Sequence, residues 1–254
     1  MEQLAGARPI VELAHARHRT EGAVGILWRD GAAVAICAHR CALVALPSAI
    51  GSLAHLERLD VGDNQLTELP ALPASLRELY VYDNQLARLP ELPRLSVLDA
   101  NRNQLTALPD LAGIDFVYLA ANRLAALPKI TAVRYLNVGN NPLGHLALAG
   151  LVGLADPALQ ELRAEQAELH TLAIEGLTGL RELSLRNNQL ESLPPSLGSL
   201  GKLGVLDLRG NRLDTLPETL RALPLTKLDL RWNPLRARPH WLDELASRGC
   251  LVYV

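Results

Sequence analysis

Residues 76–90 read LRELYVYDNQLARLP, and the spacing of the apolar residues in this stretch decides the fold. Its leucines, asparagine and proline follow the pattern L-x-x-L-x-L-x-x-N-x-L-x-x-L-P. Two weaker copies begin at residue 33, where Cys41 takes the asparagine position, and at residue 159, where Ala167 takes it. A pattern that recurs every 19–26 residues indicates a solenoid of stacked units. The other good copies begin at residues 56, 95, 114, 133, 180, 203 and 225.

The L-x-L core of each copy predicts a short β-strand. Alternate side chains of a strand point to opposite faces, so both leucines enter the core and the residue between them faces solvent. One copy cannot bury its leucines alone, whereas stacked copies bury them together. The asparagine column predicts buried amides that hydrogen-bond the backbone of adjacent turns, which is a structural role. This column comprises Asn64, Asn84, Asn103, Asn122, Asn141, Asn188, Asn211 and Asn233.

On these motifs the chain resembles the leucine-rich repeat proteins, and the L-P ending resembles their bacterial LPX subclass. The resemblance covers residues 33–239. It implies an α/β solenoid: a leucine-rich repeat horseshoe with a parallel concave β-sheet, about ten repeats, and a cap at each end. The subclass includes effectors that pathogens inject into host cells, some of which carry a ubiquitin-ligase domain after the repeats. The present sequence ends at Val254, and we expect it to lack that domain.

The sequence predicts an N-terminal cap, a repeat solenoid and a C-terminal cap at residues 1–32, 33–239 and 240–254. In the first cap, Pro9 begins an amphipathic helical pattern that runs to His18, and residues 22–31 have the pattern of a strand. The last residues, PHWLDELASRGCLVYV, predict a helix, a glycine stop and a final strand.

The repeat is irregular near residues 147–173. The step from the copy at 133 to the copy at 159 is the longest in the chain, and the latter lacks both its asparagine and its proline. One interpretation is a helix at about 147–154, inserted on the convex side of an unbroken solenoid. Another is two joined arrays with a vestigial cap between them. Because the apolar pattern resumes without a polar linker, we favour one continuous solenoid whose curvature changes near 147–158.

Aromatic side chains cluster at the solvent-facing positions of the predicted strands. Five of the six Tyr and Phe residues fall there, in only three repeats: Tyr80, Tyr82, Phe116, Tyr118 and Tyr135. Aromatics suit strands and pair across them, which explains each residue but not the clustering. Grouped exposed aromatics are typical of binding hot spots. We therefore predict that a protein partner binds the concave face here. The small residues Ala120, Ala121 and Gly139 beside the cluster leave a small ligand as an alternative.

Charged side chains occupy the other exposed columns. Three arginines stack beside Asp207 and Asp229, whereas the N-terminal half carries Asp60, Asp63, Asp83 and Asp99. Such ladders are usually ion pairs on a solvated face, each contributing little, and a phosphate or acidic-peptide site is the alternative. A face polarised in this way would orient a partner. The predicted partner-binding residues are Tyr80, Tyr82, Asp99, Phe116, Tyr118, Tyr135, Arg186, Arg209 and Arg231.

Composition and charge exclude several classes of function. The net charge of −2 lacks the basic excess of a nucleic-acid-binding protein. No apolar run reaches the roughly 18 residues that span a bilayer. The charged N-terminus lacks the apolar centre of a Sec-type signal peptide. We therefore expect a monomer with a protein partner, no nucleic acid and no membrane insertion. Its location would be the cytoplasm, or a host cell reached without a Sec-type signal.

The sequence carries no G-x-S-x-G, H-E-x-x-H or P-loop motif. Its three cysteines, Cys37, Cys41 and Cys250, form no C-x-x-C pair, which favours a reducing compartment over a disulfide framework. Cys37 and His39 come nearest to a thiol with a base. We therefore expect no enzyme activity, no cofactor and no metal. A small-ligand or peptide-binding module, or a non-catalytic subunit of an enzyme complex, is the alternative function.

Overall fold

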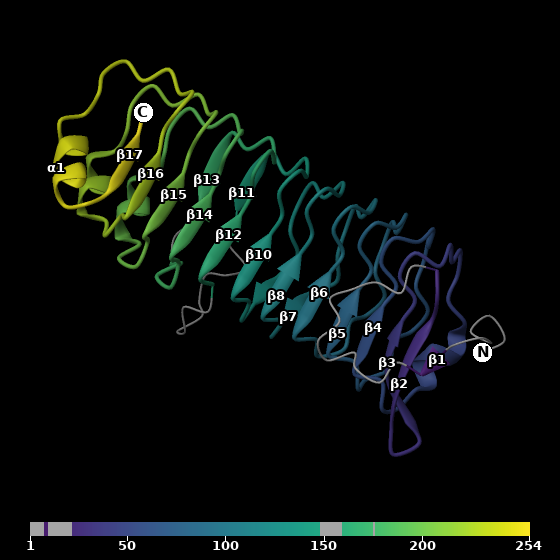
Figure 1. The fold of residues 1–254 in the computed structure, drawn as a ribbon. Helices are drawn as coiled ribbons and strands as arrows, with labels where there is room; N and C mark the ends of the chain where they lie inside the picture. The colour runs from purple at the N-terminus through teal and green to yellow at the C-terminus, as the bar shows by residue number, and fades with distance from the viewer. Residues whose placement is uncertain (1–7, 10–21, 148–158, 175) are drawn as a thin grey trace. The chain divides into compact units, whose positions relative to one another are not determined.

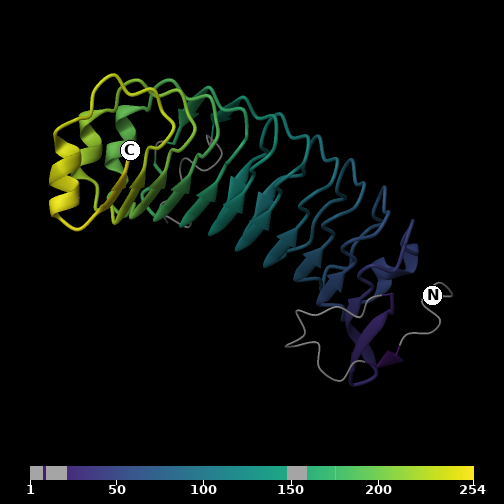
Figure 2. The ribbon, with the colours of Figure 1, turned by 45° about the horizontal axis from the view of Figure 1, so that its top comes forward.

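A computed structural model of the chain describes residues 8–9, 22–147, 159–174 and 176–254. The chain divides into two compact units, Met1–Arg123 and Leu124–Val254. Within each unit, short strands lie side by side in a row (Figure 1). The segments that return from one strand to the next lie on the other side of that row (Figure 2). This is the arrangement that the repeat pattern predicts.

The first unit is built on one sheet in which most neighbours are parallel. Its strands follow the order β1 (Arg8–Pro9), β2 (Gly25–Arg29), β3 (Ala32–Cys37), β4 (Arg58–Asp60), β5 (Glu78–Tyr80), β6 (Val97–Asp99) and β8 (Phe116–Tyr118). The hairpin of β2 and β3 is antiparallel, and the following strands pair in parallel. The returning segments include the 3-10 helix η2 (Ser48–Ser52) and the short strand β7 (Leu111–Ala112).

The second unit repeats the parallel arrangement. Its main sheet follows the order β10 (Tyr135–Asn137), β12 (Glu161–Arg163), β14 (Glu182–Ser184), β15 (Val205–Asp207), β16 (Lys227–Asp229) and β17 (Leu251–Tyr253). A second small sheet pairs β11 (His145–Ala147) with β13 (Thr171–Ala173). The other elements are β9 (Ile130–Thr131), the 3-10 helices η4 (Pro195–Ser199) and η5 (Glu218–Ala222), and α1 (Trp241–Ser247).

The copy at 76–90 shows how the pattern builds the core. Leu76, Leu79, Val81 and Leu86 are fully buried, and Leu89 nearly so. The flanking residues of β5 are only half-buried, which is the alternation expected of a strand with one face in the core. Burying an aliphatic side chain contributes about 1.5–3 kcal/mol, so the stacked leucines are the main source of stability.

The asparagine column forms the predicted ladder. The side-chain oxygen of Asn84 accepts a hydrogen bond from the backbone N–H of Leu66 at 2.9 Å, in the preceding repeat. Its amide nitrogen donates to the backbone oxygens of Val61 and Val81 at 3.0 and 3.1 Å. In the repeat where Ala167 takes the asparagine position, its backbone N–H donates to the side-chain oxygen of Asn188 at 2.9 Å. The structural role expected of this column is therefore confirmed.

The ends of the chain follow the sequence pattern in part. The strand expected within 22–31 is confirmed as β2. Of the helix expected at 9–18, Pro9 lies in β1, and residues 10–18 lie outside the described residues. At the other end, α1, a turn at Gly249 with φ of 91°, and β17 confirm the predicted helix, stop and strand. The capping role of both ends stays a prediction.

Repeat length determines the returning segments. The longer copies at 180 and 203 are followed by the 3-10 helices η4 and η5. Between β4, β5 and β6 the shorter copies return without a helix. The helix expected at about 147–154 lies outside the described residues, apart from Ala147 at the end of β11.

Candidate partner-binding face

We call the solvent-facing surface of the strands the sheet face, and the residues between the two apolar positions of each L-x-L the middle column. Strand register aligns the middle column of the first unit as Cys37, Asp60, Tyr80, Asp99 and Tyr118. In the second unit it aligns Asn137, Arg163, Ser184, Asp207, Asp229 and Tyr253. Carboxylates and tyrosines therefore alternate along one column of the first unit.

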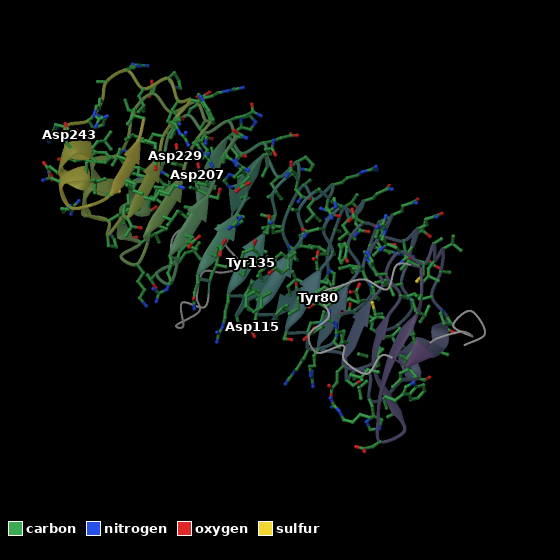
Figure 3. All side chains as sticks on the ribbon, in the orientation of Figure 1. Tyr80, Asp115, Tyr135, Asp207, Asp229 and Asp243 are labelled. Atoms are coloured by element: carbon green, nitrogen blue, oxygen red, sulfur yellow. The ribbon has the colours of Figure 1, made fainter. Side chains whose placement is uncertain are left out.

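Tyr80 lies half-buried on β5 (Figure 3), and the strand register places Asp60 and Asp99 on either side of it. The guanidinium of Arg58 lies 4.6 Å from the centre of its ring, a cation–π distance. Arg58 also forms an ion pair with Glu78 at 3.0 Å. Burial, followed by the Glu78 carboxylate, raises the pKa of Tyr80 to about 12. The neutral phenol therefore donates a hydrogen bond to the Glu78 carboxylate, at 3.1 Å.

Tyr82 is more closely engaged with its own unit than the sequence suggests. Its ring covers Gly62, where an added Cβ would lie 2.4 Å from the ring, so a larger residue at this position would displace the ring. Its hydroxyl lies 3.0 Å from Nδ1 of the buried His39. The sequence-based prediction that Tyr82 contacts a partner therefore applies to a half-buried ring whose hydroxyl already has a neighbour.

The remaining predicted aromatics lie in different units. Phe116 and Tyr118 flank Val117 on β8 of the first unit, and 43% of Phe116 is exposed. Val97, on β6, pairs with Phe116 and is itself half-buried. Tyr135 lies half-buried on β10 of the second unit. The first unit thus brings four of the five aromatic residues onto one sheet face.

Two carboxylates of the first unit have no arginine or lysine in contact among the described residues. Asp60 and Asp99 each accept a hydrogen bond from the backbone N–H two positions on, from Gly62 at 3.2 Å and Asn101 at 3.1 Å. Burial raises the pKa of Asp60, and the backbone hydrogen bond and the charge of Arg58 only partly oppose it. Burial also raises the pKa of Asp99, to about 6, against the backbone hydrogen bond from Asn101 and the charge of Arg102.

The acids of the second unit are neutralised by arginines. Arg209 and Arg231 bind Asp207 and Asp229 at 2.5 and 2.7 Å. Asp207 and Asp229 lie next to each other on β15 and β16 (Figure 3). Only 1% of the Asp229 side chain is exposed. Burial alone would raise the pKa of Asp229, but the side-chain and backbone hydrogen bonds from Arg231, with the charge of Arg209, outweigh it and lower that pKa.

Arg186 completes the predicted arginine column, and it binds Glu165 at 2.7 Å. All three arginines of this column therefore contact a carboxylate, as expected of an ion-pair ladder. A hollow of about 300 Å³ lies on this part of the sheet face. Acids and bases line it in equal number: Glu161, Glu165, Glu182 and Asp207 with Arg163, Arg186, Arg209 and Lys227. This mixed lining does not favour an anion.

The sequence-based prediction missed two exposed aromatics of the second unit. Trp232 is 71% exposed, and the guanidinium of Arg231 lies 5.5 Å from its ring and 5.1 Å from that of Tyr253. Trp232 has a φ of 62°, at the position where the preceding repeat carries Gly210 with a φ of 65°. A signal was present in the sequence, because LRWNP places a bulky residue directly before the asparagine. Tyr253 was assigned to the cap, although it continues the middle column.

The described residues contain no group of three or more His, Cys, Asp or Glu that could hold a metal ion. Cys37 and Cys250 are buried thiols, and Cys41 is half-buried. Burial raises the pKa of Cys41 and of Cys250, which makes both poorer nucleophiles. None of the helices described is both long enough and apolar enough to cross a bilayer.

Comparison with known proteins agrees with this geometry. Residues 169–235 match the family described as Leucine rich repeat, and residues 52–68 match a second family with the same description. The chain is a leucine-rich repeat solenoid. No curated protein matches the sequence.

Several solved structures are similar to this solenoid. YopM, a leucine-rich effector protein from Yersinia pestis, is 33% identical with a TM-score of 0.68, over 82% of this chain and 57% of YopM. The leucine-rich repeat domain of the type III effector XopL is 25% identical with a TM-score of 0.62, over 81% and 78%. InlJ from Listeria monocytogenes is 20% identical with a TM-score of 0.56, over 81% and 46%, and shows the fold alone. The solenoid thus resembles bacterial effectors, and it spans a little over half of the YopM chain.

Proposed function

We propose that this solenoid is a non-enzymatic protein-interaction scaffold that binds a protein partner on its sheet face. The observation that carries the proposal is the aromatic group of the first unit, in which Phe116 is 43% exposed on the side of β8 opposite the core. Tyr80 and Tyr118 lie on the same sheet face, and neither is needed to fill the core. Large aromatic side chains that remain at a protein surface are enriched among residues that dominate binding energies.

The likeness to YopM and XopL supports a narrower proposal. The L-P ending of the repeats and the identity to effector proteins favour membership of the LPX subclass. We propose that the chain acts as an effector in a host cell, reached without a Sec-type signal, or as an adaptor in the cytoplasm of its own cell. In either place it would act as a monomer that presents Tyr80, Tyr82, Asp99, Phe116, Tyr118 and Tyr135, with Arg186, Arg209 and Arg231 further along.

The test is a pull-down with the wild type and with the double variant Tyr80→Ala/Tyr118→Ala, from host and from bacterial lysates. A protein retained by the wild type is then produced and its affinity measured. We expect the double variant to lose about 2 kcal/mol or more of binding free energy, as hot-spot residues do. The matched control is Trp28→Ala, because Trp28 is an exposed aromatic in the β2–β3 hairpin. An unchanged affinity in a double variant with wild-type circular dichroism contradicts this binding face.

A further inference from the structure

The first unit carries two carboxylates with which no arginine or lysine of the described residues forms an ion pair, although the charges of Arg58 and Arg102 partly stabilise Asp60 and Asp99. Among the described residues, Asp60 and Asp99 hydrogen-bond only backbone N–H groups, at 3.2 and 3.1 Å. The nearby arginines are engaged elsewhere: Arg58 binds Glu78 at 3.0 Å, Arg40 binds Asp63 at 3.0 Å, and Arg102 binds Asp83. Half-buried carboxylates without a counter-ion are costly, because burial penalises the charged form.

Aromatic rings adjoin both carboxylates. In the strand register, Tyr80 lies between Asp60 and Asp99, and Tyr118 lies beyond Asp99. The face of a tyrosine ring attracts cations. Arg58, 4.6 Å from the ring centre of Tyr80, demonstrates this attraction within the unit itself. Carboxylates that alternate with aromatic rings form a surface suited to lysine or arginine side chains, whose stems are apolar and whose ends are charged.

A buried polar atom without a partner lies at the start of the same surface. His39 is 4% exposed, and its Nε2 has no hydrogen-bond partner among the described residues. Such atoms are uncommon in folded proteins. His39 lies two residues after Cys37, which pairs with Asp60 in the strand register. The surface therefore has a second polar feature that its own unit leaves unsatisfied.

We propose that the sheet face of the first unit binds an extended segment of the protein partner through two cationic side chains, one at Asp60 and one at Asp99. This inference rests on the proposed function and specifies the chemistry of the partner. Asp60 and Asp99 are two strands apart, which is roughly 10 Å at the usual strand spacing. A segment in the extended polyproline II conformation rises about 3.1 Å per residue with three residues per turn, so cations three residues apart lie on one side of it and match the two carboxylates.

The second unit explains why its face is not the binding surface for these cations. The middle-column acids there have internal partners, Arg209 at 2.5 Å from Asp207 and Arg231 at 2.7 Å from Asp229. An incoming lysine would compete with a guanidinium that is already in place. Charge complementarity thus selects the first unit, where the competing group is absent from the described contacts of both carboxylates.

The experiment selects random dodecapeptides displayed on phage against the full chain. Selected sequences are synthesised, and their affinities are measured by fluorescence anisotropy. We expect them to carry pairs of Lys or Arg three residues apart. Their affinity should fall about tenfold for Asp60→Asn/Asp99→Asn, because the variant removes both partner charges. The control is Asp30→Asn/Asp243→Asn, which changes the net charge equally at an exposed hairpin turn and on α1. It should stay within about twofold.

A gain-of-partner variant tests the same idea without deleting a carboxylate. Asn101→Arg places an arginine two residues after Asp99, where Arg209 follows Asp207 in the second unit. It also removes the side-chain acceptor of the Ala120 N–H, at 2.7 Å, so folding is checked by circular dichroism. The introduced arginine should weaken the binding of cationic peptides about as much as Asp99→Asn alone does.

The outcomes separate this inference from the function on which it rests. Peptides that bind Asp60→Asn/Asp99→Asn as tightly as the wild type, but are lost from Tyr80→Ala/Tyr118→Ala, overturn the cation inference and leave the binding face intact. Equal losses in the two charge-matched double variants also overturn the inference, because net charge alone then explains the binding. A selection that yields no peptide, or only peptides indifferent to all these variants, overturns both proposals.

Discussion

Asp99 in the first unit and Asp229 in the second occupy the same position of the repeat, yet only Asp229 is bound by an arginine. Each accepts the backbone N–H of the residue two positions on, at 3.1 and 3.3 Å. That residue is Asn101 in one case and Arg231 in the other, and only the arginine returns to bind the carboxylate. The pKa of Asp99 is accordingly raised to about 6, whereas that of Asp229 is lowered.

The residue two positions after the acid therefore determines whether the acid has an internal counter-ion. The backbone is nearly the same in every repeat, because the leucines and asparagines fix it. In a repeat with arginine two residues after the acid, that arginine pairs with the acid. A repeat with asparagine or glycine there keeps a charge available for another molecule. If the proposed binding face is correct, equivalent positions serve binding in the first unit and stability in the second.

The largest expected effect is the loss of the internally paired acid. Asp229→Ala leaves Arg231 without its partner, which should lower the free energy of unfolding of the second unit by about 2 kcal/mol; exposure of the arginine keeps the loss below that of a fully buried pair. Urea unfolding followed by fluorescence of the buried Trp241 measures it. The control is Asp214→Ala, which breaks an exposed ion pair with Arg236 and should cost below about 0.5 kcal/mol. Equal effects would remove the distinction between a buried and an exposed acid.

Asp99→Asn should instead raise the free energy of unfolding, and by a smaller amount than Asp229→Ala lowers it. The asparagine can still accept the Asn101 N–H, and it removes a charge that burial disfavours. Because folding raises the pKa of Asp99 from 3.8 to about 6, the folded protein holds this proton more tightly than the unfolded chain does. The wild type therefore loses stability as pH rises from 4 to 6, whereas the variant does not. We expect the variant to be more stable by about 1 kcal/mol at pH 7.5, after allowance for solvent screening.

The measurement is urea unfolding of wild type and Asp99→Asn at pH 4 and pH 7.5. The difference between the two proteins should be close to zero at the lower pH and appear at the higher one. A variant that is less stable than the wild type at pH 7.5 would show that the carboxylate has a stabilising partner, contrary to the comparison of the two units.

The fold could be predicted because its determinants are local and periodic. The alternation in L-x-L fixes which side chains are buried, and one asparagine in each full repeat fixes the turn, so neither depends on a distant contact. The copy at 76–90 and the hydrogen bonds of Asn84 match the prediction for this reason. The C-terminal helix and strand could be predicted in the same way, from a glycine between two apolar patterns.

For the candidate site, the sequence predicted which residues lie on the sheet face but not the contacts that they make. The columns placed Tyr80, Phe116 and Tyr118 on the sheet face, but they did not show that Tyr82 covers Gly62 and reaches His39, 43 residues away in sequence. Such contacts depend on rotamers and on distant neighbours rather than on periodicity. The sequence shows that Asp99 lacks an arginine two positions on, because Asn101 occupies the position that Arg231 has in the second unit. Only the structure shows that Arg102 forms its ion pair with Asp83.

The most direct test of this account is the titration of the two carboxyl groups themselves. The side-chain carboxyl carbons of Asp99 and Asp229 can be assigned by NMR, with Asp99→Asn and Asp229→Asn identifying the signals, and followed against pH. The account predicts a midpoint for Asp99 near 6 and one for Asp229 below the ordinary 3.8. Midpoints that coincide near 3.8 would contradict it, because the two units would then treat equivalent acids alike.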